Sequence, residues 1–312
     1  MIEQYYSIAV RKRNDSKDRF FNHEDFCFME IKIPLENHYW YADPFLFEYN
    51  GVCYLFFEAY DLIEQKGKIA YSILRDDYTA TKPKIIIERD YHFSFPYIFQ
   101  YNNEIYIMPE TCGDDNLQLF KATSFPDIWK EEKVLLRDVF VSDSIFLNYE
   151  SKTWLSCFEQ YRVPPKDKLF FCWGKNKIYE VRDSSVGEGT SVSEGDYGIR
   201  NAGDSFQMNH QVIRVGQNST DKQYGKGLVF FSIKSMSPYQ EEEIYAIDAV
   251  KMQNHLQFYG HTKCIDGTHT YNSSERYEVI DFSYCKKLPF GLRVARSCRI
   301  RISRLMRKLR RC

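Results

Sequence analysis

A recurring apolar hairpin is the feature that most constrains the fold of this chain. In its first copy, residues 42–58, an apolar strand starts at Asp43, turns at Asn50-Gly51 and returns to Glu58. Asn-Gly between two apolar runs is the strongest short signal for a β-hairpin. Because the two strands are antiparallel, we expect Asp43 and Glu58 to lie at the same end of the hairpin.

The hairpin pattern then repeats along the chain. The second copy, residues 95–110, has the same Tyr-Asn turn and again ends on a glutamate, Glu110. Later copies begin at Asp143, Gly203 and His269. Further strands are predicted at 67–74, 84–88, 117–122, 129–136, 168–173, 178–181, 227–233 and 242–247, and a polar Gly/Ser-rich segment, 183–198, separates the third copy from the fourth. A four-strand unit with a period of roughly 50–65 residues is typical of a β-propeller blade.

Five copies predict an all-β, five-bladed β-propeller over residues 1–285. The fifth copy has few strands of its own, so we expect a strand at 5–13 to complete the last blade and close the ring. A two-sheet sandwich is the competing fold, but it does not explain so long a period. Helix is nearly absent before the last segment of the chain, residues 286–312.

A propeller would bring separate hairpins to one mouth, because the first strands of all blades line the central channel. The residues expected there are Asp43, Phe95, Asp143, Arg200 and His269, with Glu58, Glu110 and Gln217 from the ends of the second strands. A pair of carboxyl groups can act as acid and base on a glycosidic or glycosyl-phosphate bond. Arg200 could pair with a phosphate or a sugar carboxylate, and His269 could carry a proton. Purely structural roles in turns and core packing are the alternative for each residue.

Charge is distributed unevenly along the chain. The formal net charge is −1, but residues 286–312 hold eleven Lys and Arg and no acid, so the rest of the chain holds 31 basic and 43 acidic side chains. The acidic body argues against a nucleic-acid partner. Nine cysteines follow no metal-binding spacing, which indicates reduced thiols, and no metal site is predicted. The first residues are not typical of a signal peptide and no stretch is long enough to span a bilayer, so we expect a cytoplasmic protein.

The basic segment is predicted to form an amphipathic helix, residues 288–312. Its apolar residues recur at three- and four-residue spacing, and the other faces carry Arg and Lys. Such a helix is typical of a membrane-surface anchor, so we expect it to bind the inner face of a membrane, and a packed or partner-docking helix is the alternative. The membrane contacts are assigned to Arg299, Ile302, Leu305 and Leu309.

Parts of the sequence resemble two known families of carbohydrate-related propellers. The block 42–58 resembles the first blade of the five-bladed arabinanase and β-xylosidase-like glycoside hydrolases. The blocks 94–99, 108–111, 142–144, 200–203, 217–218, 224–225 and 268–272 are more similar to the propeller domain at the N-terminus of plant glucosamine inositolphosphorylceramide transferases, which also occurs in bacterial surface-polysaccharide loci. The resemblance covers about residues 5–285 and implies a carbohydrate context.

The hydrolase resemblance transfers only in part. It assigns Asp43 as the base and Asp143 as the second acid, but where the hydrolases have a general-acid Glu this chain has Arg200 to Gly203. An Arg there favours a phosphorylated or nucleotide-linked donor over a simple glycoside. The sequence therefore predicts a glycosyltransferase of cell-surface polysaccharide, capsule or glycolipid biosynthesis with a nucleotide-sugar donor as substrate and a glycan or lipid-linked acceptor. Alternatives are a hydrolase or phosphorylase using the same mouth, or a non-catalytic glycan-binding module.

Within that hypothesis each residue has a predicted role. Asp43 would activate the acceptor hydroxyl, with Asp143 and Glu110 as the second acid or as ligands of sugar hydroxyls. Arg200 and His269 would hold the donor phosphates. The remaining substrate-binding residues are predicted to be Glu58, Phe95, Gln217 and Tyr224.

Overall fold

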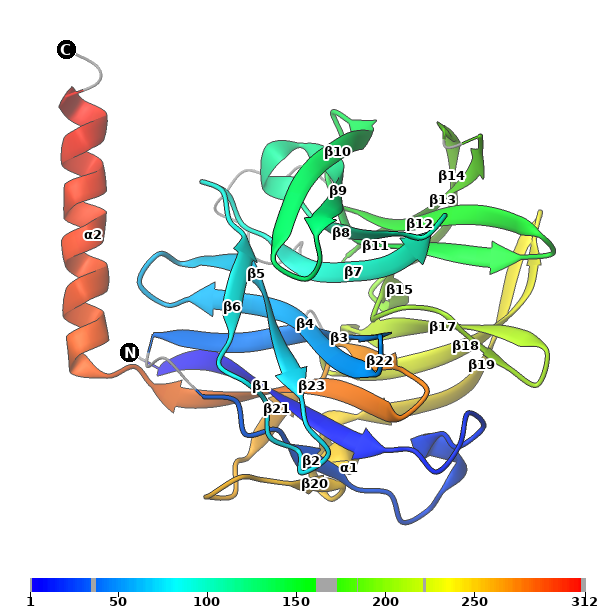
Figure 1. The fold of residues 1–312 in the computed structure, drawn as a ribbon, viewed down its shortest axis with the longest axis horizontal. Coiled ribbons are helices and arrows are strands. Elements are labelled where there is room, and N and C mark those ends of the chain that lie inside the picture. Colours follow the sequence, from blue (N-terminus) through cyan, green and yellow to red (C-terminus); the bar gives the residue numbers. More distant parts are fainter. Residues whose placement is uncertain (1, 35–37, 161–172, 184, 221–222, 310–312) are drawn as a thin grey trace.

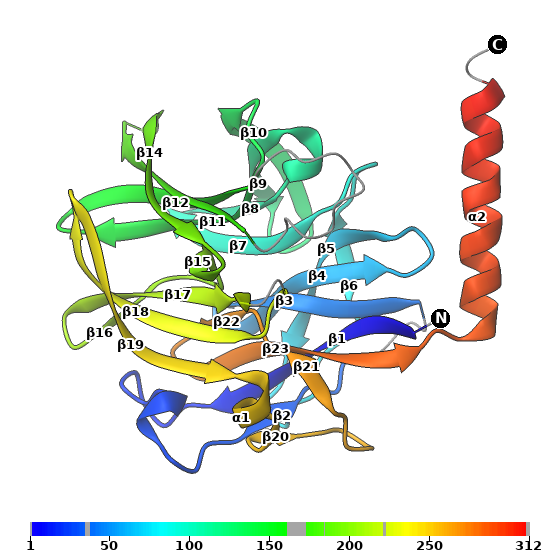
Figure 2. The same ribbon diagram turned by 180° about the vertical axis from the view of Figure 1, so that it is seen from behind.

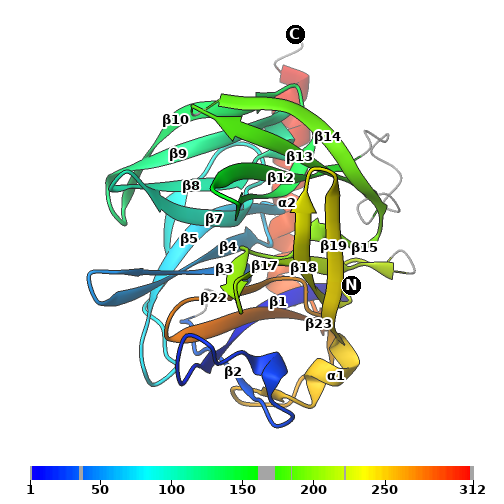
Figure 3. The same ribbon diagram turned by 90° about the vertical axis from the view of Figure 1, so that its right-hand side faces the viewer.

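The computed structural model describes residues 2–34, 38–160, 173–183, 185–220 and 223–309, without the side chains of residues 112 and 302–309. Within these ranges the chain forms five mostly antiparallel sheets. Figures 1 and 2 show them packed side by side, and Figure 3 shows them arranged in a ring. The five-bladed β-propeller predicted from the hairpin repeat is thus confirmed.

Four blades are each built from one continuous stretch of chain. Blade one contains β3 (Tyr39–Tyr49), β4 (Val52–Asp61), β5 (Lys66–Leu74) and β6 (Lys84–Ile87). Blade two contains β7 (Ser94–Tyr101), β8 (Glu104–Glu110), β9 (Asn116–Ser124) and β10 (Ile128–Arg137). Blade three contains β11 (Val141–Tyr149), β12 (Lys152–Gln160), β13 (Gly174–Arg182) and β14 (Ser185–Gly195). Blade four contains β15 (Tyr197–Asn201), β16 (Phe206–Met208), β17 (Gln211–Asn218), β18 (Gly227–Met236) and β19 (Tyr239–Asp248).

The fifth blade joins the two ends of the chain. It contains β21 (Ile265–Gly267), β22 (Tyr271–Ser273) and β23 (Tyr277–Lys287), then β1 (Ile2–Lys12), β2 (Phe28–Glu30) and β20 (Leu256–Gln257). β1 pairs with β23 without a break, from Ile2 opposite Lys287 to Lys12 opposite Tyr277. This pairing confirms that the first strand of the chain completes the last blade.

The outer part of blade three differs from the prediction. The segment 183–198, expected only to separate the third copy from the fourth, contains the whole edge strand β14. The predicted strand at 178–181 lies in the third strand, β13. The reason is close packing: a Cβ added to Gly189 would lie 2.3 Å from the ring of Tyr179 on β13. Glycine here admits an aromatic ring rather than making a turn. The predicted strand at 168–173 lies almost entirely outside the described residues.

Helix is confined to short turns and to α2 (Phe290–Leu309) in the described chain. α1 (Ala249–Gln253) is a single turn whose Asp248 side chain accepts a hydrogen bond from the Lys251 N–H. Two 3₁₀ turns lie at Phe20–Asn22 and Cys112–Asp114. No described helix has the length and the apolar character needed to cross a membrane.

The hydrophobic core lies between neighbouring blades. At the contact of blades one and two, the buried rings of Phe45 and Phe95 meet edge to face with centroids 4.9 Å apart. Edge-to-face contacts of this kind add about 0.5–1.5 kcal/mol to the area that they bury. The high aromatic content of the chain thus serves to pack sheet against sheet.

Candidate active site on the propeller axis

A β-bulge recurs at the same place in the first strand of blades one, two and three. The pairing register shifts between Ala42 and Phe45 in β3, and β7 and β11 show the same shift. The residues at the bulges, Asp43, Phe95 and Asp143, have φ values of 50°, 46° and 45°. Such left-handed backbone costs non-glycine residues about 1–3 kcal/mol and is concentrated at functional sites.

Carboxyl groups reach the same region from the second strands. Glu58 pairs with Ala42, and Glu110 pairs with Ser94 at the equivalent position of blade two. In blade five the corresponding residue is Asp281, whose N–H donates to the carbonyl of Thr270. The hairpin repeat therefore gathers five buried carboxyl groups, which are Asp43, Glu58, Glu110, Asp143 and Asp281.

Arg200 neutralises one half of this cluster. Its Nε donates to Asp143 Oδ2 and its Nη2 lies 3.3 Å from Glu110 Oε2. Gln217 Nε2 donates to the same Asp143 oxygen over 3.0 Å. Burial raises the pKa of Asp143 to about 7, against the opposing effect of Arg200. Burial would lower the pKa of Arg200, but Asp143, Tyr224 and Glu110 together outweigh burial and keep the guanidinium charged.

His269 neutralises the other half. Its Nε2 lies 3.3 Å from Asp43 Oδ1, and its Nδ1 makes a 2.8 Å ion-pair contact with Asp281 Oδ2 that lacks hydrogen-bond direction. Burial alone would lower the pKa of His269, but Asp281 and then Asp43 raise it to about 9. Asp43 Oδ1 also accepts a hydrogen bond from Thr270 Oγ1, and its Oδ2 accepts one from the Phe95 N–H. Both oxygens of Asp43 are thus engaged by the protein.

Glu58 is the least satisfied member of the cluster. Its buried Oε1 accepts no hydrogen bond in the described structure and lies 3.5 Å from His92 Nε2. His92 Nδ1 accepts a hydrogen bond from the Gly67 N–H, so this ring carries its proton on Nε2 when neutral, and burial lowers its pKa. Burial, followed by the charge of Asp43, raises the pKa of Glu58 well above its usual value. Burial therefore favours the protonated form of the Glu58 carboxyl.

Partly exposed aromatic rings surround the cluster. Tyr6 lies 5.0 Å from the His269 ring and 4.9 Å from Trp40, which stacks on Tyr60 with centroids 4.4 Å apart. On the other side, Tyr224 lies 5.1 Å from the His269 ring. The guanidinium of Arg200 lies 5.0 Å from the Tyr224 ring. Flat apolar faces beside polar groups are the surfaces that bind sugar rings.

One group of described residues has ligand atoms close enough to hold a metal ion. The oxygens of Asp43 and Asp281 and a ring nitrogen of His269 all lie within 4.8 Å of one another. His269 carries a proton between the two carboxylates at neutral pH, and a cation would have to displace it. The donor set is therefore better suited to a proton than to a metal ion near pH 7.

The structure brings together the residues that the hairpin repeat predicts for the mouth. Phe95 differs from the others, because its ring is fully buried against Phe45 and only its N–H contacts the cluster. Four further residues of the site were not predicted from the sequence, namely Asp281, Thr270, Tyr6 and His92. Asp281 could have been found, because in the sequence it closes the fifth copy of the hairpin as Glu58 and Glu110 close the first and second copies.

Known structures with similar architecture act on sugars. An α-L-arabinofuranosidase from Podospora anserina in complex with cellotriose matches with a TM-score of 0.56 and 9% identity, covering 88% of this chain and 97% of that one. The catalytic domain of a Coprinopsis cinerea α-L-arabinofuranosidase matches with a TM-score of 0.57 and 8% identity over the same shares. At such low identity these matches show a shared fold.

Closer relatives are found by sequence. Glucosamine inositolphosphorylceramide transferase 1 of Arabidopsis thaliana is 33% identical over 213 residues, which are 65% of this chain and 26% of the relative. Its namesake from Oryza sativa subsp. japonica is 29% identical over 206 residues, 65% of this chain and 27% of the relative. The chain thus spans about a quarter of the length of the curated relatives that it matches.

A family model settles where the chain belongs. Residues 31–271, most of the propeller, match the model described as glucosamine inositolphosphorylceramide transferase 1, N-terminal. The matched range includes Asp43, Glu58, Glu110, Asp143, Arg200 and His269, but neither Asp281 nor α2. The protein is a member of the family of N-terminal domains of glucosamine inositolphosphorylceramide transferase 1.

Proposed function

We propose that this chain is a glycosyltransferase that moves a sugar from an activated donor, such as a nucleotide sugar, to an acceptor hydroxyl on a glycan or glycolipid. The observation that carries the proposal is the charge balance on the axis. Five buried carboxyl groups share two cationic side chains, Arg200 and His269, so the cluster retains protons near neutral pH. Groups that hold and release protons at this pH are suited to general acid–base catalysis.

Asp143 is the best-matched base. Its described side-chain hydrogen bonds, from Arg200 and Gln217, both end on Oδ2, and its pKa is about 7. We assign Asp143 to take the proton of the acceptor hydroxyl as that oxygen bonds to the anomeric carbon. Asp43, the base predicted from sequence, uses both oxygens within the protein. Its proposed part is to hold His269 and the blade-two backbone in place.

Glu58 is the proposed acid. Burial raises the pKa of its carboxyl well above the usual value, and Oε1 has no hydrogen bond from the described chain. As the bond between the anomeric carbon and the leaving oxygen breaks, Glu58 would donate its proton to that oxygen. The acceptor proton thus ends on Asp143, and the leaving group departs with the proton of Glu58. The names of the transferase relatives support transfer as the overall reaction.

Hydrolysis or phosphorolysis of a glycoside is the second candidate. The similar folds of the two arabinofuranosidases favour it, because the same acid and base could act with water or phosphate in place of the acceptor. In that case Asp143 would deprotonate the attacking molecule and Glu58 would protonate the glycosidic oxygen. The two candidates differ in the donor that each requires.

The test is incubation with a panel of nucleotide sugars and glycan or glycolipid acceptors, with analysis of the products. Transfer predicts a lengthened acceptor that depends on the nucleotide sugar. Asp143→Asn and Glu58→Gln are expected to lower the rate at least about a hundredfold, whereas Glu180→Gln, a partly exposed acid of β13 that pairs with Lys152 and Arg182, should leave it unchanged. Release of free sugar from oligosaccharides without a nucleotide donor would favour hydrolysis. Binding of glycans without turnover of any donor would contradict both and leave a binding module.

A further inference from the structure

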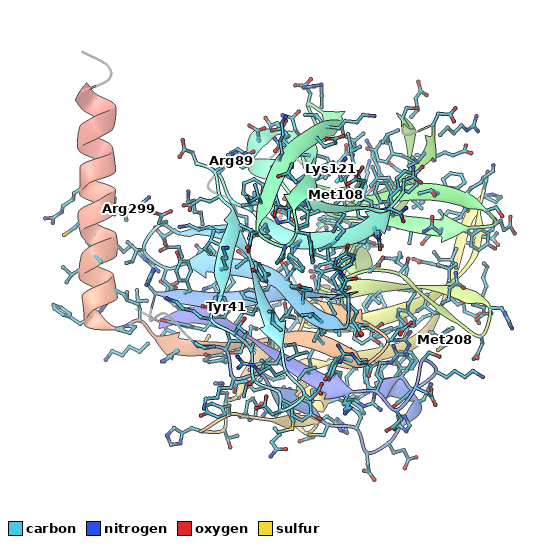
Figure 4. The ribbon with its side chains drawn as sticks, viewed as in Figure 1. Tyr41, Arg89, Met108, Lys121, Met208 and Arg299 are labelled. Atoms are coloured by element: carbon cyan, nitrogen blue, oxygen red, sulfur yellow. The ribbon has the colours of Figure 1, made fainter. Side chains whose placement is uncertain are left out.

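The helix α2 is fixed to the rim of the propeller by one of its sides. Arg296 Nε donates to the carbonyl of Leu62 over 2.8 Å, and its Nη1 pairs with Glu3 Oε1 at 2.7 Å. One turn further on, Arg299 Nη1 lies 2.8 Å from Glu64 Oε1. Figure 4 shows Arg299 on the side of α2 that faces the propeller. The first three turns of α2 are therefore held in place against the sheet.

Another side of the same turns is apolar and open to solvent. Phe290 and Val294, four residues apart, are 72% and 45% exposed. Ile2 is also exposed and pairs with Lys287, just before α2 begins. Together, Phe290, Val294 and Ile2 form what we call the outer patch. Exposed apolar side chains that are grouped in this way indicate a surface that binds another molecule or a membrane.

The charge around the outer patch is basic. The segment from residue 286 onward holds eleven Lys and Arg and no acid, whereas the rest of the chain has 12 more acidic than basic side chains. Lys286, Lys287 and Arg301 are exposed in the described part of this segment. An anionic surface would be attracted to α2 and repelled by the body of the propeller. Basic residues beside exposed apolar side chains fit the interface of an anionic bilayer.

The position of α2 relates this surface to the axial cluster. β4 ends at Asp61, three residues after Glu58, and the next residue, Leu62, is the one that Arg296 contacts. Figures 1 and 2 show α2 on the side of the propeller where β1 and β3 begin and β23 ends. Trp40 and Tyr60, beside the cluster, pack in the same apolar group as Leu292 of α2. The helix thus stands at the end of the propeller to which Glu58 and the aromatic rings belong.

We propose that the outer patch and the basic residues around it bind the surface of an anionic membrane, with α2 acting as a fixed strut that turns the axial cluster toward the lipid. The occupant is a bilayer rather than a protein groove or a nucleic acid, because exposed apolar residues, Phe290 and Val294, lie near exposed basic residues on a helix that already packs on its own propeller. The further idea that the axial cluster then meets an acceptor in the membrane rests on the proposed function. The binding of α2 to the membrane is independent of that function.

The experiment is flotation of the whole chain with vesicles of phosphatidylcholine alone or mixed with phosphatidylglycerol. We expect binding to the anionic vesicles only, weakened by salt. Phe290→Ser with Val294→Ser should abolish most of the binding, and Lys287→Gln or Arg301→Gln should each weaken it roughly fivefold. The matched controls are Val250→Ser, an exposed apolar residue on α1, and Lys152→Gln, an exposed lysine of blade three; neither should change it.

Three results would overturn the proposal. They are no binding to anionic vesicles, full binding by the Phe290→Ser/Val294→Ser variant, and tighter binding to duplex DNA than to the vesicles. Thermal unfolding that matches the unchanged protein shows that the variants are folded. Because no sugar donor is present, an absence of transferase activity leaves this test unaffected, and loss of vesicle binding leaves the transferase assay with a soluble acceptor unaffected.

Discussion

Asp43 and Asp143 adopt the same left-handed backbone conformation at equivalent bulges of blades one and three, but different cations neutralise them. Asp43 contacts His269, and Asp143 contacts Arg200. The repeat thus sets two carboxyl groups in one backbone frame and gives them different surroundings. Different surroundings are what separate the pKa values of paired acids.

Substitution of Asp43 separates its charge from its backbone conformation. Asp43→Asn should fold, with a free energy of unfolding within about 2 kcal/mol of the original, because Asn also tolerates positive φ. Donor turnover should be lost, because His269 then lacks one of its two carboxylate partners. The measurements are urea unfolding and product formation. Asp43→Val should instead lose about 1–3 kcal/mol through backbone strain. A folded Asp43→Asn protein with full activity would contradict the role given to Asp43.

Removal of Arg200 should lower the free energy of unfolding, because two buried acids then lose the cation that neutralises them. Arg200→Met leaves Asp143 and Glu110 without their shared cation, and loss of one partner of a buried ion pair costs about 3–5 kcal/mol. Urea unfolding should show this loss, and Arg200→Met with Asp143→Asn should recover part of it. As a control, Arg182→Met removes an exposed cation that pairs with Glu180 and should change stability by less than about 1 kcal/mol. Equal losses in the single and double variants would contradict the pairing.

Stability should fall as the pH rises from about 6.5 to 9. Folding raises the pKa of His269 to about 9, so its contribution is complete below its unfolded pKa of about 6.5 and is lost as the pH passes 9. His269→Gln should flatten the decline in this window, as measured by urea unfolding at several pH values. Asp143 should give a separate loss of stability as the pH rises from its unfolded pKa of about 3.9 to about 7, because folding raises its pKa to about 7 and so favours its protonated form. A decline above pH 7 that persists in His269→Gln would assign it to another group.

The sequence was sufficient for the fold and for the positions of the site, because both follow from repetition. Once Asp43 and Glu110 were placed in equivalent hairpins, propeller closure brought them to one axis. The pairing within the site could not be derived in this way. Whether Arg200 neutralises Asp143 or awaits a phosphate depends on a few ångströms across blades, and no local pattern encodes that distance. For a related reason, β14 was not predicted. Glycine at position 189 leaves room for the Tyr179 ring on the neighbouring strand, and the local sequence does not show this contact.

Gly67 should control the position of Glu58. A Cβ at Gly67 would lie 2.3 Å from Glu58 Oε1 and 2.2 Å from the backbone oxygen of Phe93, and the backbone cannot yield as a side chain can. Gly67→Ala should therefore displace Glu58, lower the free energy of unfolding by about 2 kcal/mol or more and reduce turnover as Glu58→Gln does. Gly291→Ala, in α2 with no atom near its Cβ, should be neutral or stabilising by up to about 1 kcal/mol. Urea unfolding and product formation measure both effects. Unchanged turnover in Gly67→Ala, with the stability loss present, would remove Glu58 from the catalytic assignment, because its carboxyl could then move without consequence for the reaction.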